Sequence, residues 1–370
     1  MGNKKTITAA SLVHDGHPVA TQAVPADFAW LRDSMGSETQ TMYFHLDNGC
    51  VGFVQIAWAH LTLITTVETN ALFYVPGHPC VFETHSGHSL RVSKGSREFE
   101  CKGLAMAWND DHTKLTVKYT AGKDRDPKGV AASFVFTRTS DGYKIGDAKN
   151  YIDSGTAAHY FYPAGTVTAT CEINGAKFES AGVGMFIHAH SAHIMPYNVG
   201  VEWNMAFFVG HRESVPADQR TAANTSTFHT LQYRTPDSYG AVNCSNAGLT
   251  DGSSLRAVMW DTTVEHRDKA KDANGSGYDI PANVIITARG ATTDGKAATV
   301  TFDATPAQRL HDIDVLEAMP YVVRRIVQAL ITKPFIFERF EESAKLRVEI
   351  EGEEPYTLVG VAFHELTLMG

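Results

Sequence analysis

The strongest constraint on the fold is an alternation of apolar and polar residues with a period of two. It is clearest in four segments of the chain, 114–119, 166–173, 299–302 and 345–350. Successive side chains of a β-strand point to opposite sides, so a strand with one buried face has this period. We therefore expect these segments to be strands that line cores or cavities.

Short turn dipeptides separate such segments. Asparagine or aspartate followed by glycine readily adopts the positive φ angles of tight hairpins, so successive strands are expected to pair antiparallel. The dipeptides are Asn48-Gly49, Asp141-Gly142, Asn174-Gly175 and Asp294-Gly295. There is no regular alternation of strands with helices and no glycine-rich nucleotide loop. Barrels or sandwiches are therefore favoured over a nucleotide-binding α/β fold.

The length of the chain predicts two domains. Its 370 residues exceed the length of an ordinary β-domain. A content of 43% hydrophobic and 20% charged residues is typical of globular proteins. We expect a flexible N-terminal segment at 1–26, one β-domain at 27–163 and a second at 164–370.

One segment has a helical pattern. Apolar residues between Val315 and Leu330 recur at helical spacing, which predicts a helix near 314–331 in the second domain. Pro320 either begins the regular helix or kinks it. An amphipathic stripe of this kind is expected to pack against a barrel.

Charge and composition exclude several classes of function. A net charge of −9 with scattered basic residues disfavours nucleic-acid binding. No apolar run reaches the length of a membrane span, and the first residues lack the apolar core of a secretion signal, so a cytoplasmic location is expected. The five cysteines are widely spaced without a C-x-x-C pair, which predicts reduced, buried thiols.

Four blocks of the chain, 37–55, 182–208, 232–240 and 316–336, resemble the fungal survival-factor family in content and order. The second block reads GVGMFIHAHSAHIMPYNVGVEWNMAFF and resembles the start of the second domain in that family. In the third block Asp237 replaces a proline of the family's pattern. The resemblance extends from about residue 27 to the C-terminus.

This resemblance implies an all-β fold of two consecutive lipocalin-like antiparallel β-barrels, related to the domains of carotenoid hydratases and some fungal cyclases. It also implies a non-enzymatic carrier that moves ceramide or another long-chain lipid between ER and Golgi membranes and supports survival under oxidative stress. Burial of a lipid chain is favourable by about 0.8 kcal/mol per methylene, and a barrel of about eight strands can hold one small ligand.

The first residues offer a different means of contact with membranes. Members of the family begin with an amphipathic membrane-binding segment, whereas this chain opens with Met-Gly-Asn-Lys-Lys-Thr. Gly2 and Thr6 fit the acceptor pattern for N-myristoylation. Lys4 and Lys5 are equally compatible with a solvated tail.

Candidate ligand contacts come from apolar strands that carry an isolated polar side chain. Gln55 lies between Phe53 and Trp58, and such a buried amide either bonds a lipid headgroup or the opposite strand. Asn204 presents the same choice in the second domain. The full candidate set is Tyr43, Phe53, Gln55, Trp58, Phe186, His188, His190, Trp203, Asn204 and Phe207.

Three of the histidines form H-x-H-x-x-H, at His188, His190 and His193. On a strand the first two point to one face, as a zinc or iron site requires, and a third ligand then has to be found. Candidates for it are His159, His211 and His229. Polar lining or satisfied core histidines are the simpler interpretation, so we expect neither a metal nor another cofactor.

Three classes of function follow. A lipid-binding protein accounts for the apolar content without catalytic groups, and the sequence has no G-x-S-x-G motif. An isomerase, cyclase or hydratase acting on an apolar substrate is the alternative from related tandem barrels. A scaffold in a stress pathway, without a small ligand, is the third.

Overall fold

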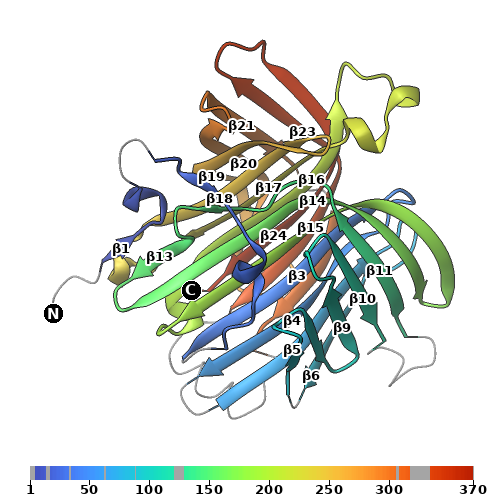
Figure 1. Cartoon of the computed structure of the whole chain (residues 1–370), viewed down its shortest axis with the longest axis vertical. Helices are drawn as coiled ribbons and strands as arrows, with labels where there is room; N and C mark the ends of the chain where they lie inside the picture. The colour runs from blue at the N-terminus through green and yellow to red at the C-terminus, as the bar shows by residue number, and fades with distance from the viewer. Residues whose placement is uncertain are drawn as a thin grey trace. The chain divides into compact units, whose positions relative to one another are not determined.

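The computed structural model divides the chain into two compact units. It describes residues 5–13, 17–32, 35–61, 64–87, 89–120, 129–305, 308–316 and 334–369. One unit, the barrel unit, comprises Met1–Val19, Asn150–Asp153 and Pro196–Gly370. The other, the curled-sheet unit, comprises Ala20–Lys149 and Ser154–Met195. Nearly all regular structure in both units is antiparallel β-sheet (Figure 1).

The curled-sheet unit is built on one long antiparallel sheet whose strand order is β6-β5-β4-β3-β15-β14-β11-β10-β9-β8-β7. β12 and β2 join it at the side of β14. Within the described residues no pairing joins β6 to β7, so the sheet curls without closing. Its elements are β2 (Ala20–Gln22), η2 (Pro25–Phe28), β3 (Gly36–Leu46), β4 (Val51–Leu61), β5 (Ile64–Tyr74), β6 (Val81–Gly87), β7 (Arg91–Ser93), β8 (Glu98–Cys101), β9 (Leu104–Trp108), β10 (Lys114–Tyr119), β11 (Ala131–Arg138), β12 (Tyr143–Ile145), β14 (Gly155–Ile173) and β15 (Ala176–Ala192).

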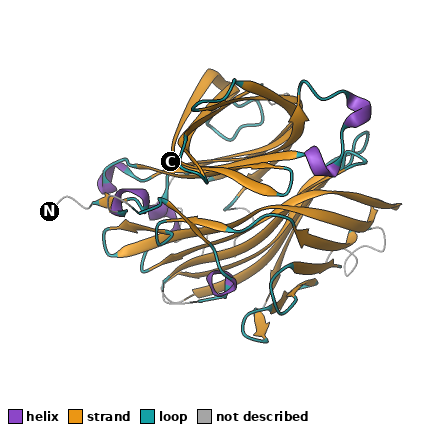
Figure 2. Cartoon of the chain, turned by 45° about the horizontal axis from the view of Figure 1, so that its top comes forward, coloured by secondary structure: helices purple, strands orange, loops and turns teal. Residues whose placement is uncertain are grey.

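The strands of the barrel unit curve into a ring (Figure 2). The order β21-β20-β19-β18-β17-β16-β24-β23 closes because β21 also pairs with the second half of β23, while β22 pairs with the first half. Its elements are β1 (Thr6–Ile7), η1 (Ala10–Leu12), β13 (Lys149–Ile152), α1 (Pro196–Val199), β16 (Glu202–Arg212), η4 (Ala217–Gln219), η5 (Ala222–Asn224), β17 (Ser226–Arg234), η6 (Asp237–Tyr239), β18 (Asn243–Asp251), β19 (Ser254–Lys271), β20 (Asp279–Thr292), β21 (Ala297–Ala304), β22 (Gln308–Asp314), β23 (Phe335–Ile350) and β24 (Tyr356–Leu368).

The two units fill their interiors with different side chains. Large aromatic rings dominate the core of the curled-sheet unit, among them Phe28, Trp30, Phe44, Trp58, Phe73, Phe99, Trp108, Tyr119, Phe134, Phe136, Tyr160, Tyr162 and Phe186. The barrel core contains few aromatic rings and many alanines, at positions 206, 247, 257, 288, 298, 304, 344 and 362. Both cores come from alternate residues of their strands, as the period-two pattern predicts.

The four segments predicted as strands are confirmed, in β10, β14, β21 and β23. Asn48-Gly49, Asn174-Gly175 and Asp294-Gly295 connect paired strands as expected, and each of the three glycines has a positive φ. Asp141-Gly142 does not, because β12 pairs with β14 and β2 rather than with β11. The two-body, all-β interpretation is correct, although among the described residues strand pairing closes the barrel unit and leaves the curled sheet open.

The predicted domain boundary between 163 and 164 is wrong. It falls inside β14, and the chain divides after Met195 instead. The resemblance misplaces the boundary because β14 and β15 form one long hairpin that belongs wholly to the curled-sheet unit.

The N-terminal segment 1–26 is also not simply flexible. In the barrel unit β1 pairs with β13, and the Thr6 hydroxyl donates to the carbonyl oxygen of Tyr239 at 2.8 Å. In the curled-sheet unit β2 pairs with β12. Gly2 lies outside the described residues, as does most of the helix expected near 314–331, and β22 runs through Asp314.

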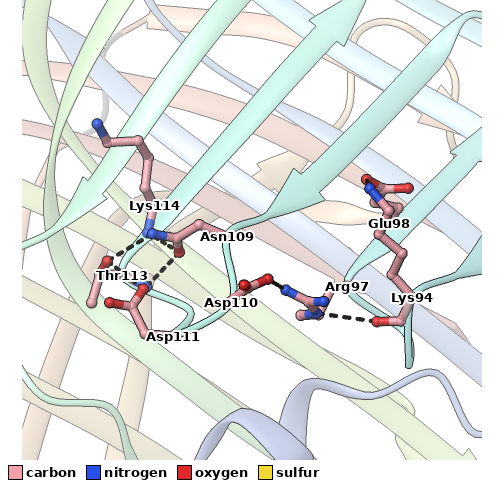
Figure 3. A network of polar contacts seen from close by, with 8 residues as sticks. All are labelled: Lys94, Arg97, Glu98, Asn109, Asp110, Asp111, Thr113 and Lys114. Atoms are coloured by element: carbon pink, nitrogen blue, oxygen red, sulfur yellow. Dashed lines mark hydrogen bonds and ion pairs between the residues drawn. The ribbon is translucent and has the colours of Figure 1, made fainter.

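Adjacent acidic residues at a turn of the curled-sheet unit, Asp110 and Asp111, organise that turn (Figure 3). Asp111 Oδ1 accepts the Thr113 hydroxyl at 2.7 Å, and Asp110 forms an ion pair with Arg97. Asn109 Oδ1 accepts the backbone N–H groups of Thr113 and Lys114, both at 2.9 Å. Since these groups are exposed and bonded to each other, they hold the hairpin between β9 and β10 in shape. Among the described residues, no helix has the length and apolarity needed to span a bilayer.

Candidate functional site

The predicted ligand contacts of the curled-sheet unit lie on opposite faces of its sheet. Trp58 and Phe186 belong to the aromatic core, and His188 and His190 follow Phe186 at alternate positions of β15, on the same inner face. Tyr43, Phe53 and Gln55 alternate with core residues and point to the outer face. These predicted contacts therefore do not line a single pocket.

Gln55 is satisfied on the outer face. Its Nε2 donates to the Thr41 hydroxyl at 2.9 Å, and its Oε1 accepts from Asn70 Nδ2 at 3.0 Å. Both partners lie on neighbouring strands, β3 and β5. Of the two interpretations of this amide, bonding to the adjacent strands is the one that the structure shows.

A buried ion pair occupies the inner face. His188 Nε2 lies 2.8 Å from Glu38 Oε1, and the two side chains are 1% and 2% exposed. The Glu38 carboxylate also accepts the backbone N–H groups of Leu31 at 2.9 Å and of Arg32 at 2.7 Å. Sequence reasoning named His188 but missed Glu38, although Glu38 lies within a block of the family resemblance.

The protons of this pair follow from its hydrogen bonds. His188 Nδ1 lies 2.7 Å from the carbonyl oxygen of Asp27, which accepts only, so Nδ1 carries a proton. Burial raises the pKa of Glu38, but the hydrogen bonds and charge of His188 and the backbone donors outweigh it and hold that pKa below its usual value. The Glu38 carboxylate therefore lies among hydrogen-bond donors from the backbone and faces the His188 ring.

The pair also fastens a segment that we call the strap, residues 23–32, over the aromatic core. Gln40 Nε2 donates to the carbonyl oxygen of Phe28 at 2.9 Å, and the Phe28 ring stacks on Tyr162 at 3.9 Å between centroids. Lys144 Nζ reaches Asp27 at 2.8 Å. Together with Glu38, these groups hold the strap from several strands, so the inner face is sealed by the chain itself.

His190 lies beside this pair, with its ring 5.7 Å from His188 and 5.9 Å from Tyr160. Burial and the charge of His188 lower the pKa of His190 to about 4, so the ring is neutral at pH 7. His193 lies beyond the end of β15 and has a φ of 58°. Among the described residues, no three His, Cys, Asp or Glu side chains gather as metal ligands would.

In the barrel unit, Asn204 lies inside the barrel and is fully buried, whereas Trp203 and Phe207 point to the other face of β16. Asn204 Nδ2 donates to Gln232 Oε1 at 3.0 Å, and Asn204 Oδ1 lies 2.9 Å from His266 Nε2. This amide is therefore the centre of an internal network, and its bonds are made within the protein.

Near this network lies an inward polar set that sequence reasoning missed, which we call the polar ring: Thr230, Thr262, Arg339 and His364. Each is buried, and each pairs in register with a neighbour on the core face of the barrel. Thr230 Oγ1, Thr262 Oγ1, Arg339 Nη2 and both ring nitrogens of His364 have no hydrogen-bond partner. The four residues are far apart in the sequence, and only closure of the barrel brings them to one interior.

Burial acts strongly on the two titratable members of the polar ring. It lowers the pKa of Arg339 to about 10, which still leaves the guanidinium charged at pH 7. Burial, with the charges of Arg339 and His266, holds the pKa of His364 well below its usual value, so that imidazole is neutral.

Small side chains lie next to the polar ring. Ala206 separates His364 from Thr230 in the register, and Ala247 follows Thr230 on β18. An interior of eight strands is either filled by side chains or holds one small ligand, and alanines at these positions contribute little side-chain volume beside the polar groups. Two larger apolar side chains, Phe228 and Leu249, face each other in register on β17 and β18 and belong to the same barrel core.

Two adjoining hollows of about 570 and 600 Å³ lie on the outer face of the curled-sheet unit, over β10, β11, β14 and β15. Exposed Thr116, Ser133, Thr168 and Thr170 line them. Their hydroxyls face solvent, so these hollows lack the buried polar groups that would fix a ligand.

Comparison with known proteins gives a family and consistent relatives. Residues 2–369 match the Svf1 family. The ceramide-binding protein svf1 of Aspergillus fumigatus is 24% identical over 361 residues, covering 90% of this chain and 86% of the relative. The ceramide-binding protein svf-1 of Neurospora crassa is 24% identical, with coverage of 94% and 90%. Survival factor 2 of Schizosaccharomyces pombe is also 24% identical, with coverage of 92% and 93%.

Solved structures share the fold. A putative AttH from Nitrosomonas europaea superposes with a TM-score of 0.60 at 12% identity, covering 95% of this chain and 99% of that one. CghA with Sch210972 gives 0.57 at 11% identity, with coverage of 99% and 98%. Kievitone hydratase from Nectria haematococca gives 0.52 at 10% identity, with coverage of 95% and 97%. At such identities the likeness extends to the fold alone.

Proposed function

Because the chain belongs to the Svf1 family, we propose that it binds a ceramide-like long-chain lipid inside the closed barrel of the barrel unit. The observation that carries this proposal is the polar ring, a set of buried polar atoms without partners beside an alanine-lined wall. The names of the curated relatives support ceramide as the reference ligand.

The chemistry of such a headgroup suits the polar ring. Ceramide offers an amide and two hydroxyls, which together accept and donate hydrogen bonds. A buried polar group left without a partner costs about 1–3 kcal/mol, so a ligand that bonds Thr230, Thr262 and His364 recovers part of that cost. The acyl chains gain about 0.8 kcal/mol for each methylene buried against apolar residues.

A hydratase or cyclase is the second candidate, favoured by the fold of its structural neighbours. The acid–base pair that such chemistry would require is Glu38 with His188. In this structure both imidazole nitrogens face acceptors within the protein, and the strap lies over the pair. A base with no free nitrogen cannot accept a proton from a substrate, which favours binding over catalysis.

The test is a titration of delipidated protein with a fluorescent C16 ceramide. We expect Ala206→Leu to weaken binding by at least tenfold, because it places a larger side chain between His364 and Thr230, where the headgroup is proposed to bind. The matched control is Ala181→Leu, the same change at an exposed position of the curled-sheet unit. Near-UV circular dichroism verifies that both variants are folded. A folded Ala206→Leu protein that binds ceramide like the wild type would overturn the assignment to the barrel.

Transfer between ER and Golgi membranes, a cytoplasmic location and a role in oxidative-stress survival are further parts of this proposal, supported by the family resemblance. Acylation at Gly2 would supply weak, reversible membrane contact. Intact mass from a host that myristoylates, compared with Gly2→Ala, tests the modification. Ceramide transfer between donor and acceptor vesicles tests the carrier role, and a protein that binds ceramide without accelerating transfer would limit the role to binding.

A further inference from the structure

We propose that the polar ring selects a long-chain lipid whose headgroup carries an anionic oxygen group, a carboxylate or a phosphate, held by Arg339 and His364. This inference rests on the proposed function, since it assumes that the barrel binds a lipid, and it specifies the class of headgroup. It predicts that an acidic lipid binds more tightly than a neutral ceramide of the same chain length.

The first observation is a buried cation without a counter-ion. Arg339 is 4% exposed, and its Nη1 donates to the carbonyl oxygen of Pro281 at 2.7 Å. Its Nη2 has no partner, and within the described part of the chain no carboxylate forms an ion pair with it. Buried charges in proteins are normally paired, because an unpaired one carries a large desolvation penalty.

The nearest acidic groups are held by another arginine. Arg309, the register neighbour of Arg339 on β22, lies 2.7 Å from Asp272 Oδ1 and also forms an ion pair with Asp312. Asp272 further accepts backbone N–H groups from Asn274 and Ser276. The charge of Asp312 raises the pKa of Arg339 from a distance, but the two side chains form no ion pair.

Three glutamates near Arg339 are also directed elsewhere. Glu338 precedes it on β23 and therefore points to the opposite face of the strand. Glu341 accepts the backbone N–H of Ser343 at the bulge of β23. Glu202, inward on β16, lies beside Asn204 and His266. Among the described residues no acceptor therefore reaches Nη2 of Arg339, and we assign that place to the ligand.

The second observation is His364, the register partner of Arg339 on β24. It is 1% exposed, and neither ring nitrogen has a partner. A neutral imidazole supplies one N–H donor, which adds to the free donor of Arg339 on the same inward face. Thr230 lies on the same level of the barrel, separated from His364 only by Ala206.

The donors occupy neighbouring inward positions, with Arg339 opposite His364 and with Thr230 beyond Ala206. A guanidinium binds carboxylate and phosphate oxygens through charge-assisted hydrogen bonds, about twice as strong as neutral ones. A hydroxyl and an imidazole N–H can bond the remaining oxygens. A neutral amide or alcohol satisfies the same donors but leaves the charge of Arg339 uncompensated, so it binds more weakly.

The experiment compares matched ligands on delipidated, full-length protein by isothermal titration calorimetry below micellar concentrations. Oleate and oleyl alcohol share one chain and differ in charge, and C16 ceramide 1-phosphate and C16 ceramide form a second pair. The variants are Arg339→Met, which removes the charge but keeps the apolar stem, and Arg267→Met as control. Arg267 is an exposed arginine of the same unit that pairs with Glu265.

We expect wild type to bind the acidic member of at least one pair about 10- to 100-fold more tightly. Arg339→Met should abolish that preference and leave the neutral lipid within about threefold, whereas Arg267→Met should leave both unchanged. Tighter binding of oleate alone identifies a carboxylate, and of the phosphate alone a phosphorylated lipid. Equal binding of neutral and acidic lipids overturns this inference but leaves the proposed function intact. Binding of none of the four lipids overturns both.

Discussion

The two units of this chain use the same antiparallel strands to make interiors of opposite character. The curled-sheet unit packs aromatic rings against one another, as in the contact of Phe44 with Phe134 at 4.8 Å, and seals its inner face with the strap. The barrel unit closes its sheet and lines it with alanines. Both units contain buried polar atoms without partners, such as Trp30 Nε1 and His190 Nε2 in the curled-sheet unit, but those of the barrel include a charged group, Arg339. One interior is built for packing, and the other retains features that packing alone does not explain.

The difference concerns polar groups as well as volume. In the curled-sheet unit the buried charge of Glu38 is matched by His188 and two backbone donors. In the barrel unit the buried charge of Arg339 has one backbone acceptor and a free Nη2. A buried charge whose hydrogen bonds are all made, such as Glu38, stabilises one arrangement of the chain. A buried charge with an unused donor, such as Arg339, is better explained by a bound ligand.

The largest effect should come from the aromatic core. Phe44→Ala removes a fully buried ring that contacts Phe73 and Phe134, so it should lower the free energy of unfolding by about 3–5 kcal/mol. Hydrogen exchange measured by mass spectrometry should show the loss in β3 and β15 and not in β17 or β18. Equal loss of protection in both units would mean that they unfold together, which would break the comparison.

The ion pair beneath the strap should give the next largest effect. Glu38→Gln removes the buried carboxylate that faces His188 and accepts the backbone N–H groups of Leu31 and Arg32, so it should cost about 3 kcal/mol at pH 7. The pKa of Glu38 is held below its usual value in the folded state, so its stabilisation is present at neutral pH and is lost as the pH falls through that pKa. Urea unfolding from pH 7 to 3 should therefore show a flatter profile in the variant. A variant as pH-sensitive as wild type would refute this role.

The barrel unit contains acidic residues with the opposite pH dependence. Glu365 and Glu338 are register partners on β24 and β23, of which Glu338 is buried and Glu365 half-buried. Burial raises the pKa of Glu365 to about 7 and that of Glu338 well above its usual value, and their mutual repulsion adds to the latter. Their contribution to the free energy of unfolding is fully present below the pKa of the unfolded state. It is lost as the pH rises toward 7.

Glu365→Gln should consequently stabilise the protein by about 1–3 kcal/mol at pH 7.5 and have little effect at pH 4. The measurement is thermal unfolding of full-length protein at both pH values, with Glu349→Gln, an exposed residue of β23, as control. A variant less stable than wild type at pH 7.5 would show that the carboxylate form is the one the fold requires.

Exposed ion pairs should not distinguish the units. Arg91 with Glu100 in the curled-sheet unit and Arg347 with Glu349 in the barrel unit are both largely solvated. Replacing either arginine with alanine should change the free energy of unfolding by less than about 0.5 kcal/mol, since exposed pairs contribute little. Denaturant melts with and without 0.5 M salt provide the check. A larger effect at one site would indicate a network that the contacts do not reveal.

The sequence predicted the elements of this fold better than their assembly. Alternation located β10, β14, β21 and β23, because each has one buried face. It could not show that the chain divides after Met195, since β14 and β15 are equally strand-like on either side of the predicted boundary. Nor could it show which sheet closes, because closure depends on pairing of β21 with β23, whose paired residues lie about 50 positions apart.

The candidate sites show the same limit. Asn204 was found because a polar residue in an apolar run is conspicuous, and His188 because it belongs to the H-x-H-x-x-H pattern; both are buried. Gln55 looked identical but points to the outer face. Arg339 was missed because it lies among other charged residues of segment 338–342, where only the register with His364 reveals its inward direction. Which face a side chain occupies depends on bulges and partners that are distant in the sequence.

The closure of the barrel has a consequence for synthesis of the chain. β16 pairs on one side with β24, and Glu202 is opposite Leu368, so the ring is incomplete until the final strand has emerged. Ribosomes add about 5–20 residues per second, which leaves β16 and its neighbours waiting for seconds with an open edge. In the curled-sheet unit one edge of β3 waits in the same way for β15, which ends at Ala192. Nascent-chain aggregation and chaperone demand should therefore be concentrated in two periods of translation, one before β15 has emerged and one before β24 has emerged.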